Sequence, residues 1–228
     1  MSVCEGAGHA MAMAVQNADA IFQGQDGMMK QRPAIVVLAA GRGMRFHGAG
    51  HKLEQQIKET GETVLSATLG HAQETGLRVV VVTSARMAPA VKRLIAARHV
   101  VVLPELDSHG RPNPEGMGYS IAAGVSASGD ADGWLIVPAD MPLLRPSSML
   151  AVASALEQYP IAFAQHRGRR GHPVGFSAEL YSELVALQGD EGARRILARY
   201  PSQAIEIDDA GVLVDVDTVE DLAALQAG

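Results

Sequence analysis

The sequence has little cysteine and no excess of positive charge, and each shortage excludes a class of protein. Cys4 is the only cysteine among 228 residues, which rules out an intrachain disulfide and an all-cysteine zinc site. The formal net charge of -6 argues against a broad face for nucleic acid or anionic membrane. No apolar run approaches the roughly 20 residues that span a bilayer, and the N-terminus lacks the features of a signal peptide. We therefore expect a cytoplasmic protein that binds neither nucleic acid nor membrane.

What is present is the composition of a folded domain, with 47% hydrophobic and 19% charged residues. Residues 1–32 differ from the rest, because Gly, Ala, Met and Gln dominate there and β-branched residues are scarce. We predict a loosely ordered N-terminal extension over 1–32, with one loose helix at Ala10–Phe22. A single domain is predicted over 33–228, a length sufficient for one hydrophobic core.

From Ala34 onward, short β-branched runs alternate with helix-like stretches, a pattern typical of a parallel sheet covered on both faces. The predicted strands are Ala34–Ala40, Val79–Thr83, His99–Leu103, Trp134–Val137, Pro160–Gln165, Val174–Phe176, Ala204–Ile207 and Val212–Val216. The predicted helices are Thr63–Glu74, Ala88–Arg98, Met117–Ser126, Pro146–Gln158, Ala178–Leu187, Asp190–Tyr200 and Thr218–Gln226. The sequence thus predicts an α/β domain.

The loop after the first strand combines two glycines with basic side chains. It is neither a dinucleotide fingerprint, since Phe46 replaces the third glycine, nor a Walker motif, since Ala49 and Gly50 follow Gly48. Glycines let backbone N–H groups approach an anion closely. Arg45 and Lys52 supply a planar fork and a compact charge for phosphate oxygens. The alternative is a glycine-rich turn with solvated basic residues.

A carboxylate follows the fourth strand, in the segment Pro138-Ala139-Asp140-Met141-Pro142. Ligands of such sheets bind at the carboxyl ends of the strands, so we expect Asp140 to face the first loop. An acid opposite a basic glycine loop suits a Mg²⁺–triphosphate complex. The alternative for a lone aspartate at a strand end is a helix cap or a turn.

Three later segments carry further candidate groups. The stretch Gly116-Met117-Gly118-Tyr119-Ser120 opens a helix, where small residues and free N–H groups suit a base or an anion. The basic run from Arg167 to His172 indicates an anion clamp or a solvated hairpin loop. At the start of the last helix, Asp217 or Thr218 is predicted to be the cap. Asp215 and Asp217 are also candidates for a second metal ligand.

The blocks Leu38-Ala39-Ala40-Gly41-x-Gly43-x-Arg45, Lys52 and Pro138–Pro142 resemble the MobA-like NTP transferase family. These are nucleotidyltransferases with a molybdenum-cofactor guanylyl/cytidylyltransferase-like domain, and the resemblance runs from about Ala34 to Leu225. It implies a three-layer α/β/α Rossmann-like nucleotidyltransferase fold with a mostly parallel mixed sheet. It also implies nucleotidyl transfer from an NTP with release of pyrophosphate.

The resemblance assigns roles to individual residues. Catalytic roles fall to Arg45, Lys52 and Asp140, nucleotide binding to Leu38, Ala39, Ala40, Gly41 and Gly43, and Mg²⁺ binding to Asp140 with Asp217 as second ligand. The family usually has a shorter Arg-to-Lys spacing, whereas residues His47 to His51 intervene here. Lys58 is therefore an alternative to Lys52.

Three segments look like the cytidylyltransferase branch of the family: Gly116–Ser120, the Gly-His-Pro-Val element and Gly189–Arg194. The resemblance then implies transfer of CMP from CTP to the phosphate of molybdopterin, whose product would pass to a molybdoenzyme. Gly116, Gly118 and Ser120 would bind the nucleotide, and Arg169, Arg170, His172 and Asp190 the acceptor. His172 is not expected to be catalytic, because phosphate nucleophiles are already ionised near neutral pH.

Three alternatives to this function remain. One is a GTP-using guanylyltransferase of the same fold. Another is a nucleotidyltransferase acting on a different small phosphorylated acceptor. The third, from another class, is a non-catalytic chaperone that binds nucleotide and inserts the cofactor into a partner enzyme.

Overall fold

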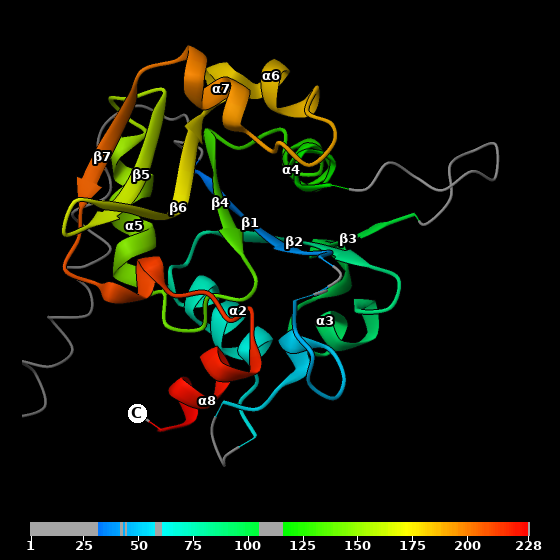
Figure 1. The fold of residues 1–228 in the computed structure, drawn as a ribbon. Coiled ribbons are helices and arrows are strands. Elements are labelled where there is room, and N and C mark those ends of the chain that lie inside the picture. Colours follow the sequence, from blue (N-terminus) through cyan, green and yellow to red (C-terminus); the bar gives the residue numbers. More distant parts are fainter. Residues whose placement is uncertain (1–31, 42, 44, 58–60, 105–115, 228) are drawn as a thin grey trace, which may run out of the picture. The chain divides into compact units, whose positions relative to one another are not determined.

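The computed structural model describes residues 32–41, 43, 45–57, 61–104 and 116–227, which form one seven-stranded sheet (Figure 1). The order of the strands is β3-β2-β1-β4-β6-β5-β7, and of these only β6 runs antiparallel to its neighbours. The strands are β1 (Ala34–Ala39), β2 (Arg78–Ser84), β3 (Val100–Leu103), β4 (Gly133–Pro138), β5 (Ile161–His166), β6 (Arg169–Ser177) and β7 (Ser202–Glu206).

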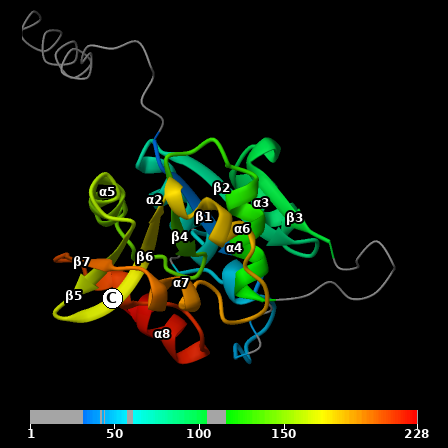
Figure 2. The same cartoon turned by 90° about the horizontal axis from the view of Figure 1, so that it is seen from above.

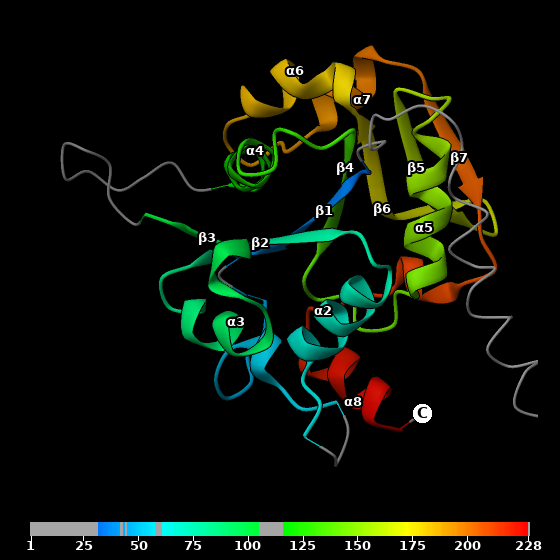
Figure 3. The same ribbon diagram turned by 180° about the vertical axis from the view of Figure 1, so that it is seen from behind.

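Helices cover both faces of the sheet, because the strands are apolar on both sides. Along β1, Ile35 and Val37 pack into the core on one face, while Val36 packs into the core on the other. The first face is covered by α2 (Val64–Glu74), α3 (Ala88–Leu94), α5 (Pro146–Ala155) and α8 (Val219–Ala227), and the second by α4 (Met117–Ser126), α6 (Tyr181–Val185) and α7 (Arg194–Arg199). Figure 2 shows α4 and α6 over the central strands, and Figure 3 shows α5 against β5 and β6.

Short 3₁₀ helices complete the described elements: η1 (Lys52–Glu54), η2 (Ala97–His99), η3 (Ala178–Leu180) and η4 (Ala210–Leu213). No helix in the described part of the chain is long and apolar enough to cross a membrane. The predicted fold class, three layers around a mostly parallel mixed sheet, is confirmed. The predicted extension and its helix at Ala10–Phe22 fall on residues outside those described, apart from residue 32.

In the second half one predicted strand is wrong and one predicted helix is shorter than expected. The segment Val212–Val216 is not a strand, because η4 occupies residues to Leu213 and extended chain follows. Asp209 imposes this turn by accepting a hydrogen bond from the N–H of Gly211 at 2.9 Å. The predicted helix Asp190–Tyr200 begins only at Arg194. Gly189 and Gly192 adopt φ values of 64° and 57°, which interrupt a helix.

Other boundaries shift as well. The predicted helix Ala88–Arg98 ends at Leu94 and resumes as η2, Ala178–Leu187 divides into η3 and α6, and Pro146–Gln158 ends at Ala155. The strand predicted at Val174–Phe176 is longer, because β6 begins at Arg169. A two-residue turn at Arg167 and Gly168, with φ values of 50° and 76°, joins it to β5 as a tight hairpin. The basic run therefore lies mostly in a strand.

The chain reverses its direction of travel across the sheet between β1 and β4. It proceeds from β1 to β2 and β3 on one side, and β4 then pairs with the other side of β1. Such a switch point is where open α/β sheets bind ligands. Leu38 pairs with Pro138, and the N–H of Ala139 donates to the carbonyl of Leu38 at 3.1 Å. The segments that follow β1 and β4 consequently leave the sheet side by side.

Candidate functional site

Lys52 lies between two aspartates at this switch point. Its Nζ atom is 2.5 Å from Oδ2 of Asp140 and 2.7 Å from Oδ1 of Asp217. The three side chains are only 11%, 15% and 15% exposed, in that order, so water screens the pairs weakly. Burial alone would lower the pKa of Lys52, but the two carboxylates outweigh it and raise that pKa. The site thus holds a charged ammonium at its centre.

Arg45 reaches the same cluster from the loop after β1. Its Nη1 atom is 2.8 Å from Oδ2 of Asp217, and its side chain is 78% exposed. Arg45 and Asp140 are therefore joined through Asp217 and Lys52, and the predicted catalytic and metal-binding residues share one place. The fallback Lys58 lies outside the described residues.

The segment that bears Asp217 is fixed by two sets of hydrogen bonds. The N–H of Val216 donates to the carbonyl of Asp140 at 2.9 Å. The helix cap belongs to Thr218, whose Oγ1 accepts from the N–H of Asp221 at 3.1 Å, while Oδ2 of Asp221 accepts from the N–H of Thr218 at 2.8 Å. The side chain of Asp217 is therefore left to the ammonium and the guanidinium, and of the two sequence alternatives the cap is Thr218.

The acidic side of the cluster has donor atoms that suit a hard cation. Oδ1 of Asp140 is buried without a hydrogen-bond partner. Burial, followed by repulsion from Asp217 and Asp140, raises the pKa of Asp215 beside them. Carboxylate oxygens are the ligands that Mg²⁺ and Mn²⁺ prefer. Among the described residues, however, no three His, Cys, Asp or Glu side chains form a ready-made metal site, and an ammonium stands between the two aspartates.

His51 connects the glycine loop to the helical turn that carries Lys52. Its side chain is buried, and its Nε2 atom is 3.1 Å from the carbonyl oxygen of Gly41. Its Nδ1 atom accepts from the N–H of Leu53 at 3.3 Å, which caps η1. Burial is the main cause that lowers the pKa of His51. Sequence analysis assigned this residue no role, because it lies in a polar, glycine-rich stretch and nothing in its neighbours indicates that its side chain is buried. Its position just before Lys52 was the available signal.

The start of α4 is closed by a distant loop. The N–H of Gly118 donates to the carbonyl of Gly189 at 2.9 Å, so the expectation that this group is free for a ligand is wrong. A Cβ atom on Gly116 would lie 2.3 Å from the Gly189 backbone, and one on Gly118 would lie 2.7 Å from the Gln188 carbonyl. The glycines therefore permit close chain approach. Asp190, predicted to begin a helix and to bind the acceptor, has its backbone N beside Gly116.

Ser120 is the fourth residue of α4. Its Oγ donates to the carbonyl of Gly116 at 3.3 Å, and the side chain is buried. The three residues predicted to bind nucleotide in this segment thus occupy one helix start, with Asp190 close by.

The basic residues of β6 divide between the two faces of the strand. Side chains alternate along a strand, so Arg169 and Arg170 lie on opposite faces. His172 follows within the segment where the register between β5 and β6 shifts, between the pairs Gln165–Arg170 and Phe163–Val174. The guanidinium of Arg170 lies 4.2 Å from the ring centroid of Phe163, and burial lowers its pKa. Burial also lowers the pKa of His172, against the opposing charge of Asp140. Phe163 was missed by sequence analysis, because it reads simply as a core residue of its strand.

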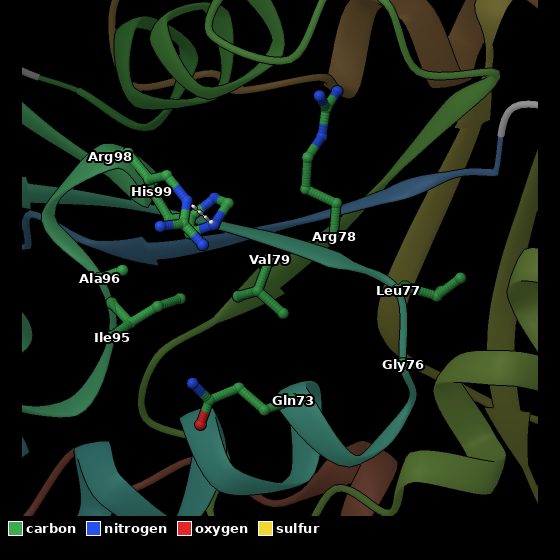
Figure 4. A pocket seen from close by; sticks show the side chains of 9 residues that line it. All are labelled: Gln73, Gly76, Leu77, Arg78, Val79, Ile95, Ala96, Arg98 and His99. Carbon is green, nitrogen blue, oxygen red and sulfur yellow. Dashed lines mark hydrogen bonds between the residues drawn. The ribbon is translucent and has the colours of Figure 1, made fainter.

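A cavity of about 530 Å³ lies where strand β2 begins, at the end of the strands opposite to the Lys52 cluster (Figure 4). It is lined by Arg78, the first residue of β2, and by residues from the end of α2 and around η2. The Nε–H of Arg98 donates to Nε2 of His99 at 3.1 Å there. Since the Lys52 cluster follows the ends of strands and this cavity lies where β2 begins, the cavity is separate from the candidate site.

The sheet with its switch point, and the loop that brings Arg45 and Lys52 to paired aspartates, are those of a nucleotidyltransferase. More narrowly, the chain belongs to the MobA-like NTP transferase domain family, whose model matches residues 35–204. The purine catabolism protein PucB of Bacillus subtilis (strain 168) is 32% identical over 193 residues, which cover 82% of this chain and 92% of PucB.

Two solved structures extend the comparison. Rv0371c from Mycobacterium tuberculosis H37Rv is 26% identical, with a TM-score of 0.71 over 88% of this chain and 100% of that one. Its complex with manganese is 25% identical, with a TM-score of 0.64 over 86% of this chain and 99% of that one. The similarity thus covers the α/β domain.

Proposed function

We propose that this chain is a Mg²⁺-dependent cytidylyltransferase that moves CMP from CTP to the terminal phosphate of molybdopterin. An oxygen of that phosphate would bond to the α-phosphorus of CTP. The bond from the α-phosphorus to the bridging oxygen would break, and pyrophosphate would leave with the electron pair. The observation that carries the proposal is the cluster in which Lys52 pairs with Asp140 and Asp217.

Asp140 and Asp217 are the residues that would hold the metal. Their oxygens are hard donors and Oδ1 of Asp140 is a buried acceptor without a partner, which fits a divalent cation. When bound, Mg²⁺ supplies charge neutralisation for the phosphate oxygens. The manganese complex of Rv0371c supports a divalent cation in this fold. A metal at the carboxylates would compete with Lys52, whose ammonium would then be available to the triphosphate.

The other residues of the cluster act by position and charge. Arg45 is the most exposed member and offers its planar fork to phosphate oxygens. Leu38, Ala39 and Ala40 lead into the loop, where Gly41 and Gly43 would let the backbone approach the triphosphate. Gly43 already adopts a φ of 62°, which favours glycine. Because the attacking phosphate is ionised near neutral pH, no general base is required, and catalysis would rest on preorganisation.

Two further surfaces complete the proposal. Gly116, Gly118 and Ser120 would bind the cytidine, and Asp190, whose backbone N lies beside Gly116, would contact the acceptor. Arg170 and His172 would bind molybdopterin, and Arg169 would contribute at the periphery. The three cytidylyltransferase-like segments support the donor and the acceptor, and the 32% identity to PucB supports membership of the same family over most of the chain. We place the reaction in the cytoplasm, with a molybdoenzyme receiving the product.

The test is pyrophosphate release from each of CTP, GTP, ATP and UTP with purified molybdopterin and Mg²⁺. Of the four nucleotides we expect release only with CTP, and release at least a hundredfold slower when Asp140→Asn replaces the wild type. Release with GTP alone would instead identify a guanylyltransferase. Release only when a different phosphorylated acceptor replaces molybdopterin would reject the acceptor. Tight nucleotide binding without pyrophosphate release would favour a cofactor-insertion chaperone.

A further inference from the structure

His51 has a defined protonation pattern that its two hydrogen bonds impose. The N–H of Leu53 donates to Nδ1, so Nδ1 carries no proton. The opposite ring nitrogen, Nε2, faces the carbonyl oxygen of Gly41 at 3.1 Å, and a carbonyl can only accept. The ring is therefore neutral, with its proton on Nε2. At 4% exposure it exchanges neither contact for water easily, and its lowered pKa agrees with this state.

One ring thereby holds both parts of the proposed triphosphate site. Through Nδ1 it caps the turn that begins with Lys52, and through Nε2 it fixes the peptide unit of Gly41, since a peptide unit is planar and turns as one body. Gly43 lies against the same ring, because a Cβ atom there would be 3.8 Å from Nε2 of His51 and 3.5 Å from Cγ of Lys52.

Neighbouring side chains also hold the residues between Arg45 and Lys52 in place. The side-chain amide of Gln55 donates to the carbonyls of Ala49 at 2.7 Å and of His51 at 3.2 Å. Phe46 lies close to Gly48, where a Cβ atom would be 2.5 Å from the ring and 3.3 Å from Val219 of α8. The segment between Arg45 and Lys52, the long connection, is thus fixed at its middle by Phe46 and Val219 and at its end by Gln55.

We infer that His51 is a positioning residue for triphosphate binding, which holds the Gly41 backbone and Lys52 in register across the long connection. The inference rests on the proposed function, since it presumes that this loop binds a nucleoside triphosphate. It assigns His51 no contact with substrate. The bond from Nε2 holds Gly41, and the bond to Nδ1 caps η1, where Lys52 lies. Substitutions that keep one of these bonds and remove the other can therefore separate the two effects.

Two substitutions separate them. In His51→Asn the side-chain oxygen can replace Nδ1 as the cap, but the amide is too short to reach Gly41. In His51→Gln the terminal NH₂ can reach the position of Nε2 and restore the bond to Gly41. Without this bond the exposed Gly41 backbone is no longer held in one orientation. The net value of one hydrogen bond corresponds to roughly a tenfold change in affinity, so we expect His51→Asn to weaken Mg²⁺–NTP binding about tenfold, while His51→Gln recovers most of it. The exposed His47, four residues earlier in the same loop, supplies the control His47→Asn, which should bind as wild type.

The probe is the Mg²⁺ complex of whichever of the four NTPs binds wild type most tightly. The experiment measures the Kd of that complex for each variant, together with the Tm of each variant. Weaker binding by His51→Asn at near-wild-type Tm, with rescue by His51→Gln, supports the positioning role. Equal binding by all variants overturns it, as do affinity losses that simply follow the Tm. The proposed function fails separately, if wild type binds an NTP but releases no pyrophosphate with molybdopterin.

Discussion

The backbone N–H of Val216 donates to the carbonyl of Asp140 at 2.9 Å, and this bond sets Asp217 beside Asp140. Both carboxylates then bind the Lys52 ammonium. An aspartate after β4 is thereby paired with one from the far C-terminal part of the fold.

Asp140→Asn removes a charge and keeps the size of the side chain. Loss of one preorganised charge contact costs about 10²–10³ in rate, so Mg²⁺-dependent pyrophosphate release should fall at least a hundredfold. Steady-state kinetics at saturating Mg²⁺ measures this. The matched control is Asp130→Asn, at the exposed ion pair with Arg78, which should retain wild-type turnover. Unchanged turnover in Asp140→Asn would remove that residue from the site.

Lys52→Met leaves two weakly exposed carboxylates without their shared cation. Breaking such a buried pair costs about 3 kcal/mol, which lowers the Tm of a domain of this size by roughly 10 °C. A divalent cation that binds both acids should restore much of this loss. Thermal unfolding with and without Mg²⁺ measures both effects. Arg78→Met, at an exposed pair, is the control. Equal Mg²⁺ shifts in wild type and Lys52→Met would mean that Lys52 and the metal do not compete.

Thr218 and Asp217 are neighbours with different tasks. Thr218→Ala removes the cap of α8 and should cost about 1 kcal/mol of stability, while Asp217→Asn should spare the cap and impair turnover. Urea unfolding and pyrophosphate release, measured on both variants, separate the two effects. If Asp217→Asn loses stability and keeps its rate, capping is its task after all.

Gly171 and Gly70 allow a matched comparison of two glycine substitutions. A Cβ atom on Gly171 would lie 2.2 Å from the carbonyl oxygen of Val212, whereas one on Gly70 would meet nothing within 4 Å. We expect Gly171→Ala to destabilise the fold by about 1–3 kcal/mol. Gly70→Ala, inside α2, should stabilise it by about 0.5–1 kcal/mol. Chemical denaturation measures the free energy of unfolding of both variants. A stabilised Gly171→Ala or a destabilised Gly70→Ala would contradict the packing described.

The pH dependence of stability should report His51. Its pKa lies below the ordinary 6.5, because burial, Arg86 and Lys52 outweigh the carbonyl of Gly41 and Glu54. The unfolded chain then binds the proton first, so this contribution is fully present above about pH 6.5 and is lost as the pH falls through the lowered value. Free energies of unfolding across this range should fall less steeply in His51→Asn than in wild type or His47→Asn. Parallel curves would assign the acid sensitivity elsewhere.

The first half of the fold could be predicted because its strands are buried on both faces. Such strands appear as continuous apolar runs, as Ala34–Ala39 and Gly133–Pro138 do. The late segments could not, because single contacts decide them. Asp209 folds Val212 into a turn through one side-chain hydrogen bond to Gly211, and a β-branched run carries no sign of that bond.

The candidate site, too, could be predicted in part. Lys52, Asp140 and Asp217 were predicted from charge beside strand ends and from family resemblance, and the structure brings them together. The link between Gly118 and Gly189 joins segments about 70 residues apart, and no local pattern predicts a partner at that range. The separation of Arg169 from Arg170 depended on the true start of β6.

Lys52 and Asp217 are 165 positions apart in the chain, and their contact spans nearly the whole domain. The site therefore exists only in molecules whose early and late segments have both docked. A ligand that binds there binds only the fully folded state. Its binding therefore raises the free energy of global unfolding and leaves the local opening of chain ends unchanged. Protection of the entire sheet against proteolysis by a metal–nucleotide complex would be the visible sign of this coupling.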